Sequence, residues 1–67
     1  MITFAKRLKE LRTEHELSTM ALGKSIGVND VSIGRWENGK TDIISENLIK
    51  LAQYFGVSTD YLLGLED

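Results

Sequence analysis

The sequence predicts an all-α fold made of five short helices. Apolar residues recur at the spacing of amphipathic helices along most of the chain, and no stretch alternates apolar and polar residues for long enough to predict a strand. Glycines and small polar residues separate the periodic segments, as expected for helix ends and caps. Because the chain has 67 residues, it has room for one small core. We therefore expect a single domain over residues 1–67.

The first helix is predicted from Ile2 to about Glu14, with Phe4, Leu8 and Leu11 on one face. No glycine or asparagine follows it to close the helix. Glu16 stands where a residue in the left-handed conformation is expected, which costs roughly 1 kcal/mol for a residue with a Cβ.

The second helix is predicted to begin after Ser18, whose hydroxyl can cap it, and to end near Ile26 before Gly27. A third helix is then expected from Asp30 to about Asn38, with Asn29 as its cap. Two helices joined by a short turn that contains glycine match the helix-turn-helix unit, here over about residues 18–38. Any hairpin of two helices uses the same devices, so the spacing alone leaves a purely structural role open.

The fourth helix is predicted to start at Ser45 and to end at Gly56, and a short fifth helix follows from Ser58 or Thr59. Leu48, Leu51, Ala52 and Phe55 share one face of the fourth helix, and Tyr61 and Leu62 lie in the fifth. Two adjacent isoleucines, Ile43 and Ile44, come just before the fourth helix. We favour the interpretation that one of them packs under the loop, over a contact surface for a partner.

The net charge of −2 and the pI near 5.3 argue, taken alone, against a nucleic-acid partner. The charges are unevenly distributed, however. Residues 1–40 carry seven Lys and Arg against five Asp and Glu, a net charge of +2, whereas residues 41–67 carry Lys50 against five acids, a net charge of −4. The positive side of the molecule is therefore expected in its N-terminal part.

Several function classes lack their usual residues. There is no Cys, and the single His15 cannot build a metal site, so we expect no metal and no cofactor. The sequence shows no glycine-rich phosphate loop and no nucleophile with a base, which argues against an enzyme or a small-molecule substrate. No apolar run is long enough to span a membrane, and the charged start does not fit a secretory signal. We expect a cytoplasmic protein.

The order and spacing of five motifs are more specific than the helix pattern. They are FAKRLKELR, LS, IGV, RWENGK and LAQYFGVSTDYLLG, and together they resemble the Cro/C1-type (XRE-like) helix-turn-helix repressors over nearly the whole chain. The resemblance implies a compact five-helix domain of the lambda-repressor-like type. It also implies a symmetric homodimer, formed in solution or only on DNA, that binds an inverted-repeat operator in double-stranded DNA.

The resemblance assigns roles to individual residues. Base-reading positions fall on Asp30, Val31, Ser32 and Arg35. Phosphate-contacting positions fall on Ser18, Thr19, Asn38 and Lys40, together with nearby loop amides. Arg12 and Glu37 match a structural ion pair that joins the first helix to the end of the third. The sequence departs from the family pattern at Thr19, where Gln is frequent, at Gly23, where Ala is expected, and at Ile43 and Ile44, which replace a frequent Pro-Ser.

Other residues have two interpretations. Asp30 can accept a hydrogen bond from cytosine, but its favourable position near the positive end of a helix dipole is the slightly preferred explanation. Gly34 either lets the helix backbone approach DNA closely or is simply tolerated. Trp36 is expected to cover the core with its N–H directed outward. Tyr61 and Leu62 form either a subunit contact or an intramolecular cap.

The predicted function is therefore a sequence-specific DNA-binding transcriptional regulator, and more specifically a repressor. Its helix over residues 30–38 would read the operator in the major groove. The alternative is a protein-interaction module on the same scaffold, antitoxin-like or an anti-repressor, in which the acidic C-terminal half meets a basic protein. The sequence leaves open the operator, whether binding represses or activates transcription, and the effector. It also leaves open whether the chain is complete or the N-terminal half of a longer repressor.

Overall fold

The computed structural model describes residues 2–67, and it contains five helices and no strand in that range. Met1 and the side chain of Ile2 lie outside the described residues. The helices are α1 (Ile2–Glu14), α2 (Thr19–Ile26), α3 (Asp30–Glu37), α4 (Ser45–Phe55) and α5 (Thr59–Leu63). The predicted all-α fold and the order of its helices are confirmed, with the third helix ending one residue earlier than expected.

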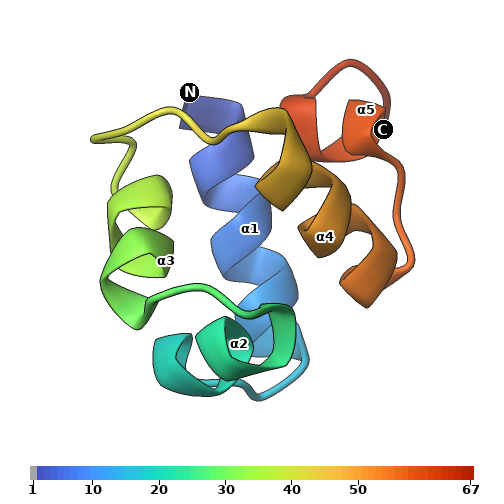
Figure 1. Ribbon diagram of the computed structural model, residues 1–67. Helices are drawn as coiled ribbons and strands as arrows, with labels where there is room; N and C mark the ends of the chain where they lie inside the picture. The colour runs from blue at the N-terminus through green and yellow to red at the C-terminus, as the bar shows by residue number, and fades with distance from the viewer. Residues whose placement is uncertain (1) are drawn as a thin grey trace.

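The central helix α1 lies between α3 on one side and α4 and α5 on the other, and α2 closes one end of the molecule (Figure 1). Side chains from all five helices meet in one core around α1. The buried members of this core are Phe4, Leu8, Leu11, Leu22, Ile26, Ile33, Trp36, Leu51, Ala52, Phe55 and Leu62. Each fully buried Leu or Ile contributes roughly 1.5–3 kcal/mol through the apolar surface that it removes from water.

The predicted caps are formed. Ser18 Oγ accepts a hydrogen bond from the amide of Ala21 at 3.0 Å, and Asn29 Oδ1 accepts one from the amide of Val31 at 2.8 Å. Ser58 caps α5 in the same way. Gly27 ends α2 in the left-handed conformation. These local signals fix the short turn between α2 and α3, and thereby the orientation of α3 relative to α2.

Glu16 adopts the left-handed conformation that its position predicts, with φ of 56°, and it is the only residue other than glycine that does so in the range 2–67. The loop around it is held by backbone hydrogen bonds from Glu16 to Thr13 and from Leu17 to Arg12. The cost of the left-handed Glu16, roughly 1 kcal/mol, is therefore offset by a loop with satisfied backbone groups.

The two isoleucines before α4 separate as expected. Ile43 packs against the core, whereas the side chain of Ile44 is 62% exposed. Ile44 is also the N-cap residue of α4, with extended backbone angles and no side-chain hydrogen bond to the helix. The first turn of α4 therefore lacks the cap that α2, α3 and α5 have.

Ile44→Ser is expected to raise the free energy of unfolding by about 1 kcal/mol, because serine can cap the helix from the backbone conformation that is already present. Urea denaturation followed by circular dichroism measures the change. Ile49→Ser is the matched control, because it also replaces a half-exposed isoleucine of the α4 region with serine but cannot form a cap. An equal gain in both variants would show that the loss of exposed apolar surface, and not the cap, is responsible.

The structure separates the two residues of α5 that were considered for a subunit contact. Leu62 is fully buried, so it caps the core within the chain and the alternative of a subunit contact is wrong for this residue. Tyr61 is half-buried, and the guanidinium of Arg7 lies 4.3 Å from the centre of its ring. Within residues 2–67 no helix has the length and apolar character needed to cross a membrane.

Candidate functional site

The third helix has one buried and one open face. Ile33 and Trp36 point into the core, which confirms that the indole covers the core. On the open side, residues 31, 34, 35 and 38 follow each other at helical spacing and so lie on one face. Val31 on this face is 58% exposed, so its methyl groups are accessible from outside the protein.

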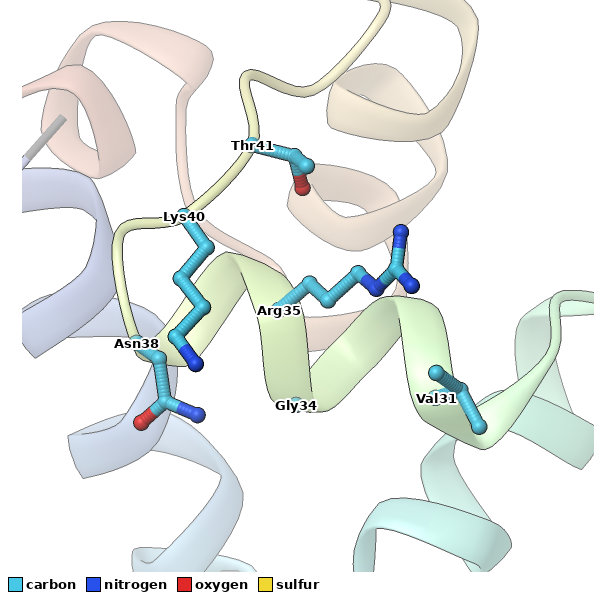
Figure 2. A pocket seen from close by; sticks show the side chains of 6 residues that line it. All are labelled: Val31, Gly34, Arg35, Asn38, Lys40 and Thr41. Atoms are coloured by element: carbon cyan, nitrogen blue, oxygen red, sulfur yellow. The ribbon is translucent and has the colours of Figure 1, made fainter.

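This open face forms one side of a shallow depression. Its lining residues are Val31, Gly34, Arg35, Asn38, Lys40 and Thr41. Figure 2 shows that the Arg35 side chain extends along α3 toward the Val31 end, while Lys40 folds back toward Asn38 from the loop. Gly34 lies on α3 between Val31 and Asn38 (Figure 2). It leaves the helix backbone uncovered, because outside the backbone of its own helix and its chain neighbours no atom stands within 4 Å of where its Cβ would be.

The depression brings together some of the predicted site residues and leaves others aside. Val31 and Arg35, predicted to read bases, share it with Asn38 and Lys40, predicted to contact phosphate. Asp30 and Ser32 do not line it; they lie about 100° to either side of Val31 around the helix and are half-buried. Thr41 is a lining residue that the sequence analysis missed, although its position directly after Lys40 offered a signal.

Ser18 and Thr19 stand apart from the depression, at the start of α2. Ser18 Oγ accepts a hydrogen bond as the cap of α2, so its hydroxyl hydrogen stays available for an outside acceptor. The amides of Thr19 and Met20 donate to no acceptor in residues 2–67, as is usual for a first helical turn. This end of α2 therefore offers several hydrogen-bond donors and the positive end of a helix dipole.

The loop after α3 offers fewer amides than the resemblance implied. The amides of Asn38, Gly39 and Lys40 donate to the carbonyls of residues 34, 36 and 35, at 3.0 to 3.2 Å. These three loop amides are thus satisfied within the protein, and the expectation that they serve a ligand needs correction. The donors that remain at this end of the depression include the side-chain amide of Asn38 and the ammonium of Lys40.

An ion pair fixes α3 against α1. Arg12 Nε lies 2.6 Å from Glu37 Oε2 and Arg12 Nη2 lies 2.9 Å from Glu37 Oε1, so both carboxylate oxygens are engaged. Arg12 Nη1 also donates to the carbonyl of Leu17 at 2.8 Å. The hydrogen bond to Glu37, aided by the attraction between the charges, raises the pKa of Arg12 against the opposing effect of burial. The arginine therefore carries its positive charge at neutral pH.

A close approach of backbones holds α2 against the turn. A Cβ added at Gly23 would lie 2.7 Å from the carbonyl oxygen of Val28 and 3.3 Å from the amide nitrogen of Asp30. The glycine carbonyl accepts the amide of Val28 at 2.9 Å. Gly23 therefore lets the second helix touch the first residues of α3, which sets the position of the open face.

Comparison with known proteins gives one family. The helix-turn-helix family model matches residues 8–62. The repressor protein C2 of Salmonella phage P22 is 38% identical over 58 residues, which cover 87% of this chain and 27% of the repressor. The HTH-type transcriptional regulator YobD of Bacillus subtilis is 36% identical over 64 residues, which cover 96% of this chain and 57% of that protein. The chain thus spans little more than half of YobD and about a quarter of the P22 repressor.

The fold matches a solved complex. The crystal structure of the P22 c2 repressor bound to a synthetic operator superposes with a TM-score of 0.86 at 34% identity, covering 92% of this chain and 94% of that one. Two weaker similarities carry other functions. The antitoxin PezA of Streptococcus pneumoniae is 30% identical over 88% of this chain and 37% of its own. The hydroxypropylphosphonic acid epoxidase of S. wedmorenis has a TM-score of 0.80 at 27% identity, but the match covers only 32% of that enzyme.

Proposed function

Because the chain belongs to the helix-turn-helix family, of the Cro/C1 type, we propose that it is a sequence-specific DNA-binding regulator that represses transcription. In this proposal α3 enters the major groove of double-stranded DNA. One observation carries it: the exposed Val31 and Arg35 share a single open face with the donors Asn38 and Lys40. A base-reading helix needs such a face, with a phosphate-binding edge beside it.

The four base-reading residues differ in what they can recognise. The guanidinium of Arg35 can donate two hydrogen bonds to the N7 and O6 of guanine, and the exposed Val31 can contact a thymine methyl group. Asp30 can accept from the N4 of cytosine, and Ser32 can bond to several bases. Because Asp30 and Ser32 are half-buried at the flanks of the face, we assign the main reading to Val31 and Arg35.

Phosphate contacts would hold α3 in register from both sides. Lys40 and Asn38 supply side-chain donors at the end of α3, while Ser18 and Thr19 supply a hydroxyl and a free amide at the start of α2. These contacts do not depend on sequence. They account for binding by a protein of net charge −2, because the charges that matter are local.

We further propose that the protein acts as a homodimer in the cytoplasm. Few cations surround the open face, so electrostatic attraction contributes little to the affinity of a single copy for DNA. Two copies related by a two-fold axis would place their α3 helices in successive major grooves, about 10 base pairs apart. The operator would then be an inverted repeat.

Selection of bound sequences from a randomised duplex pool tests the function. The protein is expected to enrich an inverted repeat, at low and at moderate salt. If no sequence is enriched and the protein does not shift any duplex even at low salt, the proposal is wrong.

Arg35→Ala is expected to weaken binding to the selected duplex by about tenfold and to relax the preference for guanine at one position of each half-site. A parallel selection and a titration by fluorescence anisotropy measure both effects. Lys50→Ala is the matched control, because it removes a cation from α4, away from the lining residues of the depression. An Arg35→Ala variant that keeps the full preference would exclude Arg35 from base reading.

A second candidate is a protein-interaction module whose acidic half, residues 41–67, binds a basic partner. The net charge of −4 in this half favours it, and so does the similarity to the antitoxin PezA. In that case reversing the charges of Asp42, Glu46 and Asp60 would abolish binding of the basic partner protein, whereas Arg35→Ala would not. The opposite result would favour DNA binding.

A further inference from the structure

A second depression lies next to the one on the open face of α3. It is lined by Ala5, Lys6, Glu37, Asn38 and Gly39, and so runs between the first turns of α1 and the end of α3. Asn38 lines both depressions. The surface that carries Arg35 and Lys40 therefore continues past Asn38 to Lys6, which is distant in the sequence and was not among the predicted site residues.

The charges along this surface favour an anion. Glu37 lines the second depression, but both of its carboxylate oxygens are engaged by Arg12, so it does not neutralise Lys6. Across residues 2–67, neither Lys6 nor Lys40 forms a salt bridge with a carboxylate. Both lysines are exposed. Two unpaired ammonium groups thus flank the exposed side-chain amide of Asn38.

We propose that Lys6 contacts a phosphate of the DNA backbone, beside the phosphate held by Asn38 and Lys40. The proposal rests on the DNA-binding function proposed above and extends its contact surface from α3 onto α1. A lysine suits this role because its ammonium is a point charge on a flexible stem and needs no fixed geometry. Its contribution is independent of base sequence.

Lys6 lies within α1, so its position beside Asn38 is set by the packing of α1 against α3. The Arg12–Glu37 ion pair joins α1 to the end of α3. It therefore holds the backbone of Lys6 at a fixed position relative to Asn38. The side chain also enlarges a small set of cations: the first depression contains only Arg35 and Lys40. A third positive group on this side matters because residues 41–67 carry a net negative charge that repels DNA.

The test compares Lys6→Gln with the wild type on two duplexes of about 30 base pairs, one recovered by the selection above and one of random sequence. Affinity is measured by fluorescence anisotropy over a series of salt concentrations. We expect the slope of log affinity against log salt to become shallower by about 0.9 for each Lys6 in the complex. Affinity for the two duplexes should fall by similar factors, so that the preference for the selected sequence is unchanged.

Lys50→Gln is the matched control, because it removes the same charge from α4. It should leave the salt slope at the wild-type value, and circular dichroism should show both variants folded. If Lys6→Gln gives the same slope as Lys50→Gln, or lowers affinity for the selected duplex alone, Lys6 contacts no phosphate and the inference is overturned. If the wild type binds neither duplex, the proposed DNA-binding function itself fails.

Discussion

Glu37→Gln is expected to lower the free energy of unfolding by about 3 kcal/mol, because it leaves the Arg12 guanidinium charged without its counter-ion. The side chains of the pair are only 15% and 7% exposed, so water cannot replace the lost carboxylate well. Burial of an unpaired charge is among the few single changes that cost this much in a small domain. Urea and thermal denaturation measure the loss, and the midpoint temperature should fall by more than about 10 °C.

The double variant Arg12→Met with Glu37→Leu should recover most of that loss, because it removes the stranded charge and fills the space with apolar atoms. A double-mutant cycle over the two positions separates the pairwise energy from the desolvation of each group. For comparison, Glu46→Gln breaks the Glu46–Lys50 pair, which is 3.9 Å long and exposed, and should cost less than about 0.5 kcal/mol.

An effect of Glu37→Gln no larger than that of Glu46→Gln would show that Arg12 is solvated in the folded protein. The stability of the domain would then not depend on this pair. The ion pair also has a consequence for function. Since it anchors the end of α3 next to Asn38, its loss should weaken DNA binding even under conditions in which the variant is folded.

Much of the fold is predictable from the sequence because its signals are local. The hydroxyl of Ser18, the amide side chain of Asn29 and the left-handed Gly27 each determine a helix end within a few residues. The sequence only narrows the choice of the open face of α3, since Val31, Ile33 and Trp36 are the large apolar residues of this helix. The pattern cannot decide that Val31 is the one left outside without knowing where the core lies.

The parts that could not be predicted depend on contacts between distant segments. Lys6 lies beside Asn38 because α1 packs along α3, and nothing in the local sequence of either helix indicates this. The burial of Leu62 follows from the docking of α5 against α1. The internal hydrogen bonds of the loop amides at 38–40 depend on how the end of α3 turns, which a sequence pattern does not specify.

Gly23→Ala is expected to destabilise the protein by up to about 2 kcal/mol, although alanine is the better helix former. Helix propensity alone predicts a gain of about 1 kcal/mol. Against this, the added Cβ would lie 2.7 Å from the Val28 carbonyl oxygen, which belongs to the backbone and cannot rotate away. Overpacking of this kind costs typically about 1–3 kcal/mol. We therefore expect the steric term to exceed the gain.

Gly34→Ala provides the control within the same helix-turn-helix unit. It has the same change in helix propensity, but its Cβ would meet no other residue within 4 Å, so the free energy of unfolding should rise by about 0.5–1 kcal/mol. Urea denaturation of the two variants thus gives shifts of opposite sign. If Gly23→Ala also stabilises the protein, the turn between α2 and α3 can move at little cost. The position of α3 would then be set by the Arg12–Glu37 pair and the core, and not by the close approach at Gly23.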